Sequence, residues 1–327
     1  MIHIVGAGWY GCYIGKYLSQ KGIDYVIWEK DEIFSGASGN NQNRLHQGFH
    51  YPRCSATRFQ ARQGFNNFEQ EFKKVIFDIP KNYYAVDKNS ILDFATYKTI
   101  FRAEGYDFEE MDLNDLPIES LQGVVSVNER GICPKKSEKY WRDMQLNIVI
   151  GSEAKLDDGL LYVDEKLVSK KGEKIIDCSW GSLAKSTAYY KEDFLVLRLD
   201  KLRQLNFDAL TVMDGPFFSI FPEDSSMNKY TLTSVEHGKL SKGSMDVRSL
   251  ELAVKKNLNY IRSVYPNFEI DFKYTGFYIG RKLKLHSIRS DSRMLASAIE
   301  GNVLKIYSGK IDAIFDTKKI VDDFILS

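Results

Sequence analysis

The residues best suited to chemistry lie at the start of the chain, where residues 6–11 read G-A-G-W-Y-G and Glu29 follows the next apolar run. Glycines at this spacing permit a tight turn and let backbone N–H groups approach a pyrophosphate at a helix N-terminus. A carboxylate after the second strand accepts hydrogen bonds from ribose hydroxyls and repels a 2′-phosphate. The pattern therefore predicts a dinucleotide site that disfavours NADP and leaves FAD and NAD as alternatives.

Two histidines, His46 and His50, follow in a polar loop at residues 35–53. Because imidazole titrates near working pH, either histidine is a candidate general base for an alcohol substrate. The alternative is that each only hydrogen-bonds a flavin or the backbone. If the dinucleotide is FAD, an amine substrate would lose its hydride directly to flavin N5 without a strong base, and Tyr51 and Tyr278 would then be candidates to orient it.

The elements that position the glycine turn form a β-α-β unit. Apolar periodicity predicts a strand at 2–5, a helix at 11–21 and a strand at 25–28 that ends at Glu29. The first strand opens the chain, and the polar loop at 35–53 follows the acid directly. This arrangement favours FAD over NAD.

The rest of the chain alternates between segments with the apolar periodicity of helices and segments with that of strands. Phe65, Phe68 and Phe72 share one face of a helix predicted at 55–75. Further helices are predicted at 91–104, 135–146, 247–263 and 310–326, and further strands at 83–86, 147–150, 174–177, 194–199, 230–235 and 303–307. Asp157, Asp158 and Gly159 form a predicted hairpin turn.

These elements predict an α/β fold with a Rossmann-type FAD-binding domain and an interleaved α+β substrate domain, built on a mostly antiparallel sheet. We assign residues 1–78, 131–185 and 280–327 to the FAD-binding domain, and residues 79–130 and 186–279 to the discontinuous substrate domain.

Composition limits the possible partners. Lys and Arg total 45 against 44 Asp and Glu, so no field of one sign favours nucleic acid or an anionic membrane surface. The cysteines at 12, 54, 133 and 178 form no C-x-x-C pair, which argues against a zinc site and a disulfide framework. We expect no metal, reduced thiols, a cytoplasmic location, no secretion signal and no membrane span.

Taken together, four segments resemble the D-amino acid oxidase superfamily of FAD-dependent oxidoreductases, which includes sarcosine oxidase, glycerol-3-phosphate dehydrogenase and L-2-hydroxyglutarate oxidase. These are residues 6–30, residues 43–51 (N-R-L-H-Q-G-F-H-Y), residues 175–181 (I-I-D-C-S-W-G) and residues 308–311 (S-G-K-I). The second segment resembles the hydroxyglutarate branch. The resemblance covers the FAD-binding segments and matches the substrate domain only in outline.

The resemblance implies sites for the cofactor, which we expect to be noncovalent FAD. It assigns the ADP part to Gly6, Gly8, Gly11 and Glu29, with Trp9, Tyr10, Lys30, Cys178 and Trp180 alongside. Ser38, Asn43, Arg44, Leu45 and His46 would run beside the flavin. Ser308, Gly309, Lys310 and Ile311 would point a helix N-terminus and a cation at its pyrimidine edge, where reduction leaves negative charge.

Arg281 is implied as the substrate ligand. In the amino-acid oxidases, an arginine at a similar place binds the substrate carboxylate, and a guanidinium suits this bidentate role. The family usually continues with Pro and an Asp-Gly turn, whereas this chain continues with a basic stretch. That stretch contains His286, Arg289 and Arg293 and is either a site for a more highly charged anion or a solvated loop.

Three functions remain open at this point. The preferred one is an oxidase or dehydrogenase of the C–N or C–O bond of a small anionic substrate, with oxygen or another electron acceptor. The second is a non-redox flavoenzyme resembling UDP-galactopyranose mutase, which acts on a sugar nucleotide. The third is a redox-sensing or binding module that retains FAD without turnover.

Overall fold

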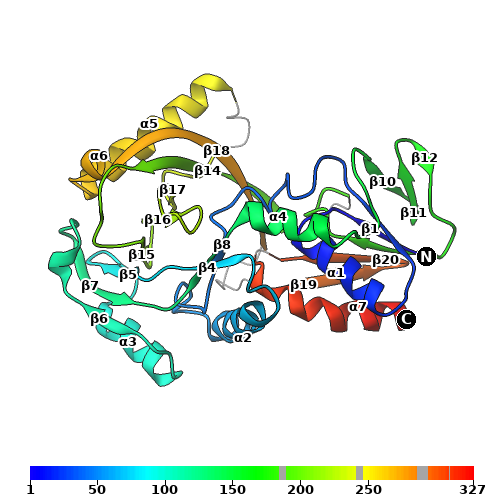
Figure 1. Cartoon of the computed structure of the whole chain (residues 1–327), viewed down its shortest axis with the longest axis horizontal. Helices are drawn as coiled ribbons and strands as arrows, with labels where there is room; N and C mark the ends of the chain where they lie inside the picture. The colour runs from blue at the N-terminus through cyan, green and yellow to red at the C-terminus, as the bar shows by residue number, and fades with distance from the viewer. Residues whose placement is uncertain (184–188, 241–245, 286–293, 309) are drawn as a thin grey trace.

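The computed structural model describes residues 1–183, 189–240, 246–285, 294–308 and 310–327. Its strands form two large sheets and two small three-stranded sheets (Figure 1). In this view the six-stranded sheet and both chain termini lie at one end, and most of the eight-stranded sheet lies at the other (Figure 1).

The six-stranded sheet has the order β19-β20-β13-β1-β2-β9. Its strands are β1 (Ile2–Val5), β2 (Tyr25–Trp28), β9 (Ile148–Val149), β13 (Lys174–Asp177), β19 (Ala296–Glu300) and β20 (Val303–Tyr307). All neighbours are parallel except β19 and β20. Because parallel strands end at the same edge, the segments that follow β1, β2, β13 and β20 meet there.

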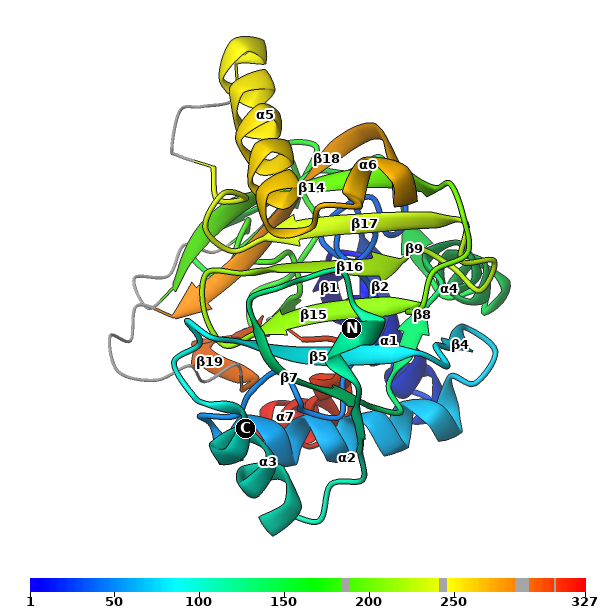
Figure 2. The same cartoon turned by 90° about the vertical axis from the view of Figure 1, so that its left-hand side faces the viewer.

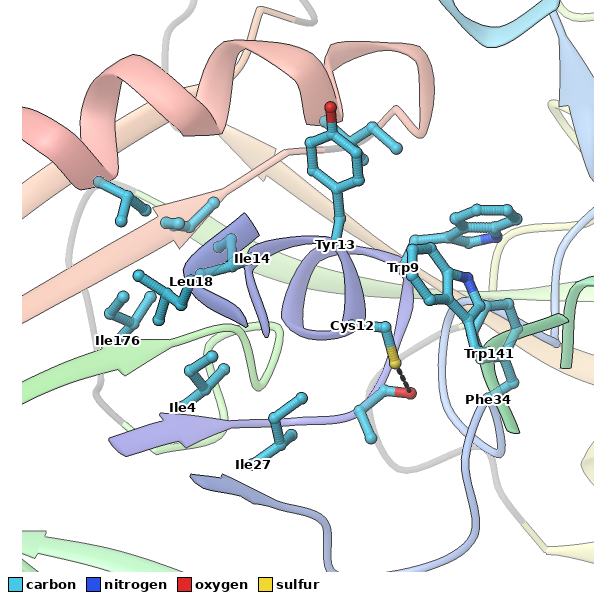
Figure 3. Close-up of a cluster of buried hydrophobic side chains, with 14 of the residues drawn as sticks. Ile4, Trp9, Cys12, Tyr13, Ile14, Leu18, Ile27, Phe34, Trp141 and Ile176 are labelled. Carbon is cyan, nitrogen blue, oxygen red and sulfur yellow. Dashed lines mark hydrogen bonds between the residues drawn. The ribbon is translucent and has the colours of Figure 1, made fainter. Parts of the chain in front are cut away.

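Helix α1 (Trp9–Gln20) covers one face of this sheet. Ile4, Ile27 and Ile176 point from the strands toward Ile14 and Leu18 of the helix (Figure 3), and all five are buried. Such matched apolar faces bury a strand surface and a helix stripe together, which is the main source of stability for a β-α-β unit.

The start of α1 is fixed by an aromatic cluster. The Trp9 indole packs within 5.2–5.6 Å, between ring centroids, of Phe34, Phe68, Phe72 and Trp141. These rings come from the loop after β2, from α2 (Ser55–Glu71) and its end, and from α4 (Pro134–Asp143). The phenylalanine face predicted at 55–75 therefore packs directly against the beginning of the glycine-turn helix.

The eight-stranded sheet has the order β18-β14-β17-β16-β15-β5-β7-β6 (Figure 2). Its strands are β5 (Asn82–Asp87), β6 (Glu109–Met111), β7 (Leu121–Ser126), β14 (Tyr189–Lys201), β15 (Ala209–Met213), β16 (Phe218–Pro222), β17 (Lys229–Ser234) and β18 (Phe272–Leu285). Neighbours are antiparallel except β5 and β15, which are parallel.

The helices α3 (Phe94–Ala103), α5 (Val247–Val264) and α6 (Phe268–Asp271) accompany this sheet, and the 3-10 turn η1 covers Leu113–Asp115. One small sheet contains β10 (Ala154–Asp157), β11 (Leu160–Val163) and β12 (Lys166–Leu167). The other contains β3 (Arg44–Leu45), β8 (Arg130–Ile132) and β4 (Ile76–Asp78), and it joins the polar loop to the segment before α4.

The predicted α/β fold class is confirmed, with mixed sheets and one parallel pair in the mostly antiparallel one. The prediction for the C-terminal helix was wrong at its start. Residues Asp312–Asp316 form a 3-10 turn, η2, and α7 begins at Thr317 and ends at Leu326. This turn packs closely against α2, because Gly64 lies directly against the backbone of Asp312. The domain boundaries stay a proposal, and β18 continues past residue 279 to Leu285.

None of the helices in the described ranges combines the length and apolarity that a membrane crossing needs.

Candidate active site

A cavity of about 960 Å³ runs from the edge of the six-stranded sheet to one face of the eight-stranded sheet. Its walls include the glycine turn, the segment between Phe34 and Cys54, residues after β13, parts of β15, β16 and β18, and residues 310–312. Ligand pockets usually measure ~300–1,000 Å³, so this cavity suits a large ligand. The edge that it meets is the one where the parallel strands end, which is the usual binding edge of such sheets.

The glycine turn is locked by close backbone contacts. Gly6 has a φ of +103°, and a Cβ there would lie 2.7 Å from the carbonyl oxygen of Cys178. A Cβ on Gly11 would overlap the carbonyl oxygen of Gly6. Only glycine fits at either position, so the spacing that predicted the turn reflects a real steric requirement.

Glu29 lies beside the turn, at the end of β2. Its Oε2 accepts a hydrogen bond from the Ala7 N–H at 2.7 Å, and its Oε1 accepts one from the Asp31 N–H at 3.1 Å. Glu29 and the exposed Lys30 line the cavity. At the start of α1, the Ser38 hydroxyl accepts a hydrogen bond from the Trp9 N–H at 3.0 Å. The turn, the acid and Ser38 therefore surround one end of the cavity.

Two further segments border this end. Cys178 and Trp180 follow β13, and Trp180 has a φ of +60°. The Tyr10 hydroxyl donates a hydrogen bond to the Lys310 carbonyl oxygen at 2.5 Å, which joins α1 to the C-terminal segment. Burial raises the pKa of Tyr10, so its hydroxyl stays protonated and continues to donate.

The segment from Asn41 to His46 crosses the face of the eight-stranded sheet. The Asn41 carbonyl oxygen accepts a hydrogen bond from the Tyr278 hydroxyl on β18 at 2.8 Å. Gln42 Oε1 then accepts hydrogen bonds from Ser219 on β16 and Thr233 on β17, both at 3.0 Å. Gln42, Arg44 and His46 all contact side chains of this sheet.

Arg44 is held over β15 and β16. Its guanidinium carbon lies 4.4 Å from the centre of the Phe221 ring, and Nη1 donates a hydrogen bond to the Thr211 hydroxyl at 2.6 Å. The buried Nε and Nη2 atoms have no hydrogen-bond partner among the described residues. Burial lowers the pKa of Arg44, although a guanidinium remains charged at neutral pH. Arg44 lines the cavity with unmatched donors.

His46 and His50 meet in the cavity wall, with ring centroids 5.4 Å apart. His46 Nδ1 lies 3.3 Å from the Tyr84 hydroxyl and 3.5 Å from Glu129 Oε2. Burial and then the charges of Lys310 and Arg44 hold the pKa of His46 well below its usual range. Burial and the nearby His46 do the same for the pKa of His50. Both imidazoles are therefore neutral at neutral pH.

Lys310 and Asp312 form a second buried charged group at the cavity. Lys310 Nζ lies 3.7 Å from Asp312 Oδ2 and 3.8 Å from the centre of the Tyr51 ring. Burial acts to lower the pKa of Lys310, but Asp312 and Tyr51 outweigh it, so the pKa is raised. The ammonium therefore stays charged. Its Nζ has no hydrogen-bond partner within the described part of the chain.

Arg281 has a partner within the chain. Its Nε and Nη2 donate hydrogen bonds to the two carboxylate oxygens of Asp193, at 2.6 and 3.1 Å. The side chain lines the cavity and is 46 % exposed. A substrate carboxylate at Arg281 would therefore have to share or displace Asp193.

Most residues proposed for the site reach the cavity. These are Gly6, Gly8, Trp9, Tyr10, Glu29, Lys30, Ser38, Asn43, Arg44, His46, His50, Tyr51, Cys178, Trp180, Arg281, Lys310 and Ile311. Gly11, Leu45, Tyr278 and Ser308 are described but do not line it, and the Leu45 side chain belongs to the hydrophobic core. Gly309, His286, Arg289 and Arg293 lie outside the described residues.

Sequence reasoning missed several residues that the fold brings to the site. Glu129, Tyr84, Thr211 and Asp312 come from four separate segments and contact His46, Arg44 or Lys310. Asp312 could have been predicted from the sequence, since it lies two residues after Lys310, which belongs to a proposed flavin segment. Glu129 and Thr211 belong to no recognisable motif, and only the tertiary fold places them here.

The residues present fit FAD. Gly6, Gly8 and Trp9, at the start of α1, line the cavity, and a helix N-terminus is a suitable place for a pyrophosphate. Unmatched buried donors along the cavity include Lys310 Nζ and Trp180 Nε1. FAD carries phosphate and ring carbonyl oxygens that accept such hydrogen bonds. Fold and cavity together define a dinucleotide-binding α/β protein with a second, sheet-based layer.

Comparisons with known proteins narrow this class. The family model described as FAD dependent oxidoreductase (DAO) matches residues 1–109. FAD-dependent monooxygenase FPY4 of Fusarium mangiferae is 32 % identical over 333 residues, which cover 95 % of this chain and 87 % of that protein.

Among solved structures, glycine oxidase from Geobacillus kaustophilus has a TM-score of 0.73 and 14 % identity, and the match covers 99 % of this chain and 94 % of the other. The open form of NikD, an amino acid oxidase essential for nikkomycin biosynthesis, has a TM-score of 0.75 and 11 % identity, with 99 % and 93 % covered. At these identities the structural matches support the fold alone.

The chain belongs to the DAO family of FAD-dependent oxidoreductases, and FAD is its cofactor. The comparisons do not favour the mutase-like alternative. None of these matches confirms the predicted relationship to the L-2-hydroxyglutarate oxidase branch.

Proposed function

We propose that the protein oxidises a C–N or C–O bond of a small anionic substrate, such as an amino acid, an N-substituted amino acid or a 2-hydroxy acid. When bound, FAD supplies the acceptor for a hydride at its N5 atom. The observation that carries the proposal is the buried Arg44 guanidinium, whose Nε and Nη2 have no partner among the described residues. A guanidinium with free donors in an enzyme cavity suits recognition of an anion.

The proposal assigns the substrate anion to Arg44 first. Arg281 remains a second candidate, because its donors are already used by Asp193. His46 and His50 are candidate bases, and Tyr51 is the candidate to orient the substrate, because Tyr278 does not line the cavity and its hydroxyl donates to Asn41. Lys310 would stabilise negative charge on the reduced flavin, since its buried ammonium has no hydrogen-bond partner among the described residues and lies near Asp312 and the Tyr51 ring.

Several finer features belong to the same proposal. We propose that FAD is bound without a covalent link, that oxygen or another acceptor reoxidises it, and that the enzyme is cytoplasmic. The segment at 43–51 supports a relationship to the L-2-hydroxyglutarate oxidase branch through its resemblance alone. The two large sheets support the division into an FAD-binding and a substrate domain.

The experiment is an anaerobic titration of the purified holoenzyme. Panels of amino acids, N-methyl amino acids, 2-hydroxy acids and sugar nucleotides are added while the visible absorbance of the flavin is recorded. We expect bleaching by one of the first three panels. A flavin that none of these panels bleaches would contradict the proposed function.

A second candidate function is monooxygenation, which the name of the Fusarium relative favours. It is tested with the same holoenzyme by adding NADH or NADPH and air together with each panel. Oxygen transfer from labelled oxygen gas into a product would support the monooxygenase, whereas bleaching by the substrate alone supports an oxidase or dehydrogenase.

A further inference from the structure

Behind His46 lies a polar pair that the proposed function does not use. The Tyr84 hydroxyl donates a hydrogen bond to Glu129 Oε2 at 2.7 Å, and the Gln47 N–H donates one to Glu129 Oε1 at 2.7 Å. Glu129 is only 2 % exposed. Neither Glu129 nor Tyr84, both of them described, lines the cavity. Glu129 and Tyr84 therefore contact His46 on the side of its ring that faces away from the cavity.

This arrangement fixes how His46 carries its proton. Both oxygens of Glu129 accept hydrogen bonds, as an ionised carboxylate does. His46 Nδ1 faces Glu129 Oε2 at 3.5 Å and the Tyr84 oxygen at 3.3 Å, so it is the nitrogen that bears hydrogen. The lone pair is then on Nε2, at the far side of the ring from Glu129. His46 presents a basic nitrogen at the cavity wall.

Burial, together with the charges around His46, keeps that nitrogen unprotonated before reaction. The titratable and charged groups that surround it are His50, Tyr51, Tyr84, Glu129, Arg44 and Lys310. Arg44 and Lys310 oppose a proton on the ring, while Glu129 compensates part of the charge once a proton arrives. A base held neutral but supported by a buried carboxylate is suited to accept one proton from a substrate.

We infer that the bond oxidised is the C–O bond of an alcohol, with His46 as the base and Glu129 as the residue that positions it. This inference rests on the proposed function. The substrate C–H bond breaks and its electron pair leaves as hydride to the flavin, which is reduced. The O–H bond breaks and its proton passes to His46 Nε2. The carbon is oxidised as the C–O bond becomes C=O.

An amine would not need this device. The lone pair of a neutral amine forms the second C–N bond as hydride leaves, so no proton has to be removed in the same step. An alcohol that lost hydride without a base would become a protonated carbonyl, which is a very strong acid. The buried carboxylate and neutral imidazole therefore favour an alcohol over an amine that binds in its neutral form.

His50 does not duplicate this role. It has no carboxylate within hydrogen-bonding distance in the described structure, and its buried Nδ1 has no partner there. Because the two rings are 5.4 Å apart, a proton on His46 makes a second proton on His50 unfavourable. Only one of the two histidines therefore carries a proton at a time, and the nearby Glu129 carboxylate favours His46.

The first test reads His46 directly and needs no substrate. Nitrogen-15 NMR of the histidine-labelled holoenzyme, with His46→Gln used for assignment, reports the tautomer and protonation state of the ring. We expect a neutral ring with hydrogen on Nδ1 at pH 7, and a shift toward the other tautomer in Glu129→Gln. The exposed, distant Glu110→Gln is the matched control. A ring protonated at pH 7, or a tautomer that Glu129→Gln leaves unchanged, would overturn the inference.

The second test uses paired substrates. Hydroxy acids and amino acids of the same carbon skeleton, together with sugar acids, are added to the anaerobic holoenzyme. We expect bleaching by an alcohol, a rate at least tenfold lower in Glu129→Gln, little change in half-saturating concentration, and an altered pH profile. A general base contributes ~10²–10⁴-fold, so partial loss of its support should be measurable.

The outcomes of the second test are distinguishable. Bleaching by amines alone would overturn the inference and leave the proposed function standing. Bleaching by an alcohol at an equal rate in wild type and Glu129→Gln would remove Glu129 from the mechanism. A flavin that neither class bleaches would overturn the proposed function itself.

Discussion

Arg44 is an arginine whose placement costs folding free energy. A buried N–H without a partner costs about 1–3 kcal/mol, and Arg44 has two such atoms, Nε and Nη2, among the described residues. Stacking on Phe221 and the bond to Thr211 offset part of this cost. Costly polar groups of this kind persist where a ligand completes their hydrogen bonds, and that is the role proposed for Arg44.

The comparison of Arg44 with Arg281 gives the first prediction. Arg44→Gln should raise the half-saturating concentration of the bleaching substrate by about 10–100-fold, because a hydrogen bond to a charged group contributes about 1.5–3 kcal/mol. Arg281→Gln should have a smaller effect, since Asp193 already binds that guanidinium. Stopped-flow flavin reduction measures both, with melting curves as the folding control. A larger effect of Arg281→Gln would indicate that Arg281, and not Arg44, is the main ligand of the substrate anion.

Gly11 gives the second prediction at this scale. In Gly11→Ala the new methyl group would overlap the carbonyl oxygen of Gly6, and the turn would have to open. We expect a lower melting temperature and a lower ratio of flavin to protein absorbance after purification. Ser19→Ala is the matched control, because Ser19 is exposed on the same helix and does not line the cavity. Full flavin content in Gly11→Ala would show that the turn tolerates a side chain.

Among the elements, the contact of α2 with η2 controls where Lys310 and Asp312 lie. Gly64 in α2 leaves room for the Asp312 backbone, and a Cβ there would overlap its carbonyl oxygen. In a free helix, Gly→Ala stabilises by about 1 kcal/mol. Because of this contact, we expect Gly64→Ala to destabilise the protein instead. The substitution should lower the melting temperature and change the flavin spectrum by moving η2.

The same helix provides the control for this third prediction. Asn67→Ala, at an exposed position of α2, should leave the melting temperature unchanged or slightly raised because alanine favours the helix. If Gly64→Ala stabilises the protein as much as Asn67→Ala does, α2 and η2 are not tightly packed.

Elements with strong local patterns were predictable from the sequence, and sites made by distant contacts were not. The β-α-β unit has its periodic apolar residues, its glycines and Glu29 within one short stretch. The local pattern was therefore enough to predict the fold of this unit and the position of Glu29 beside the glycine turn. The 3-10 turn before α7 was not predicted, and its contact with Gly64 of α2 joins distant segments that no local pattern connects. Glu129 likewise reaches His46 only because β8 pairs with β3, which no local pattern reveals.

For the whole molecule, the cavity exists because two sheets built from interleaved segments meet. The segment at 41–46 leaves the six-stranded layer and crosses the eight-stranded one, so it carries Arg44 and His46 onto the face of the second sheet. Burial of charged groups between the layers is a cost of this arrangement. It makes the stability of the whole protein sensitive to pH.

The fourth prediction concerns that sensitivity. The folded protein holds the pKa of both His46 and His50 well below the unfolded value of about 6.5, so below this pH the unfolded chain binds protons that the folded chain does not. The stability present at pH 7 is therefore lost as pH falls. The free energy of unfolding should drop by up to about 1.4 kcal/mol per pH unit for each histidine.

Denaturant unfolding of the holoenzyme between pH 5 and 8 measures this slope. The double variant His46→Gln, His50→Gln should unfold with a shallower dependence on pH, because the two groups that resist protonation are gone. His237→Gln, outside the cavity, controls for the loss of an imidazole. An equally steep slope in the double variant would mean that other groups cause the acid sensitivity. A shallow slope in the wild type would mean that water reaches the two histidines, and their role as neutral bases would lose its physical basis.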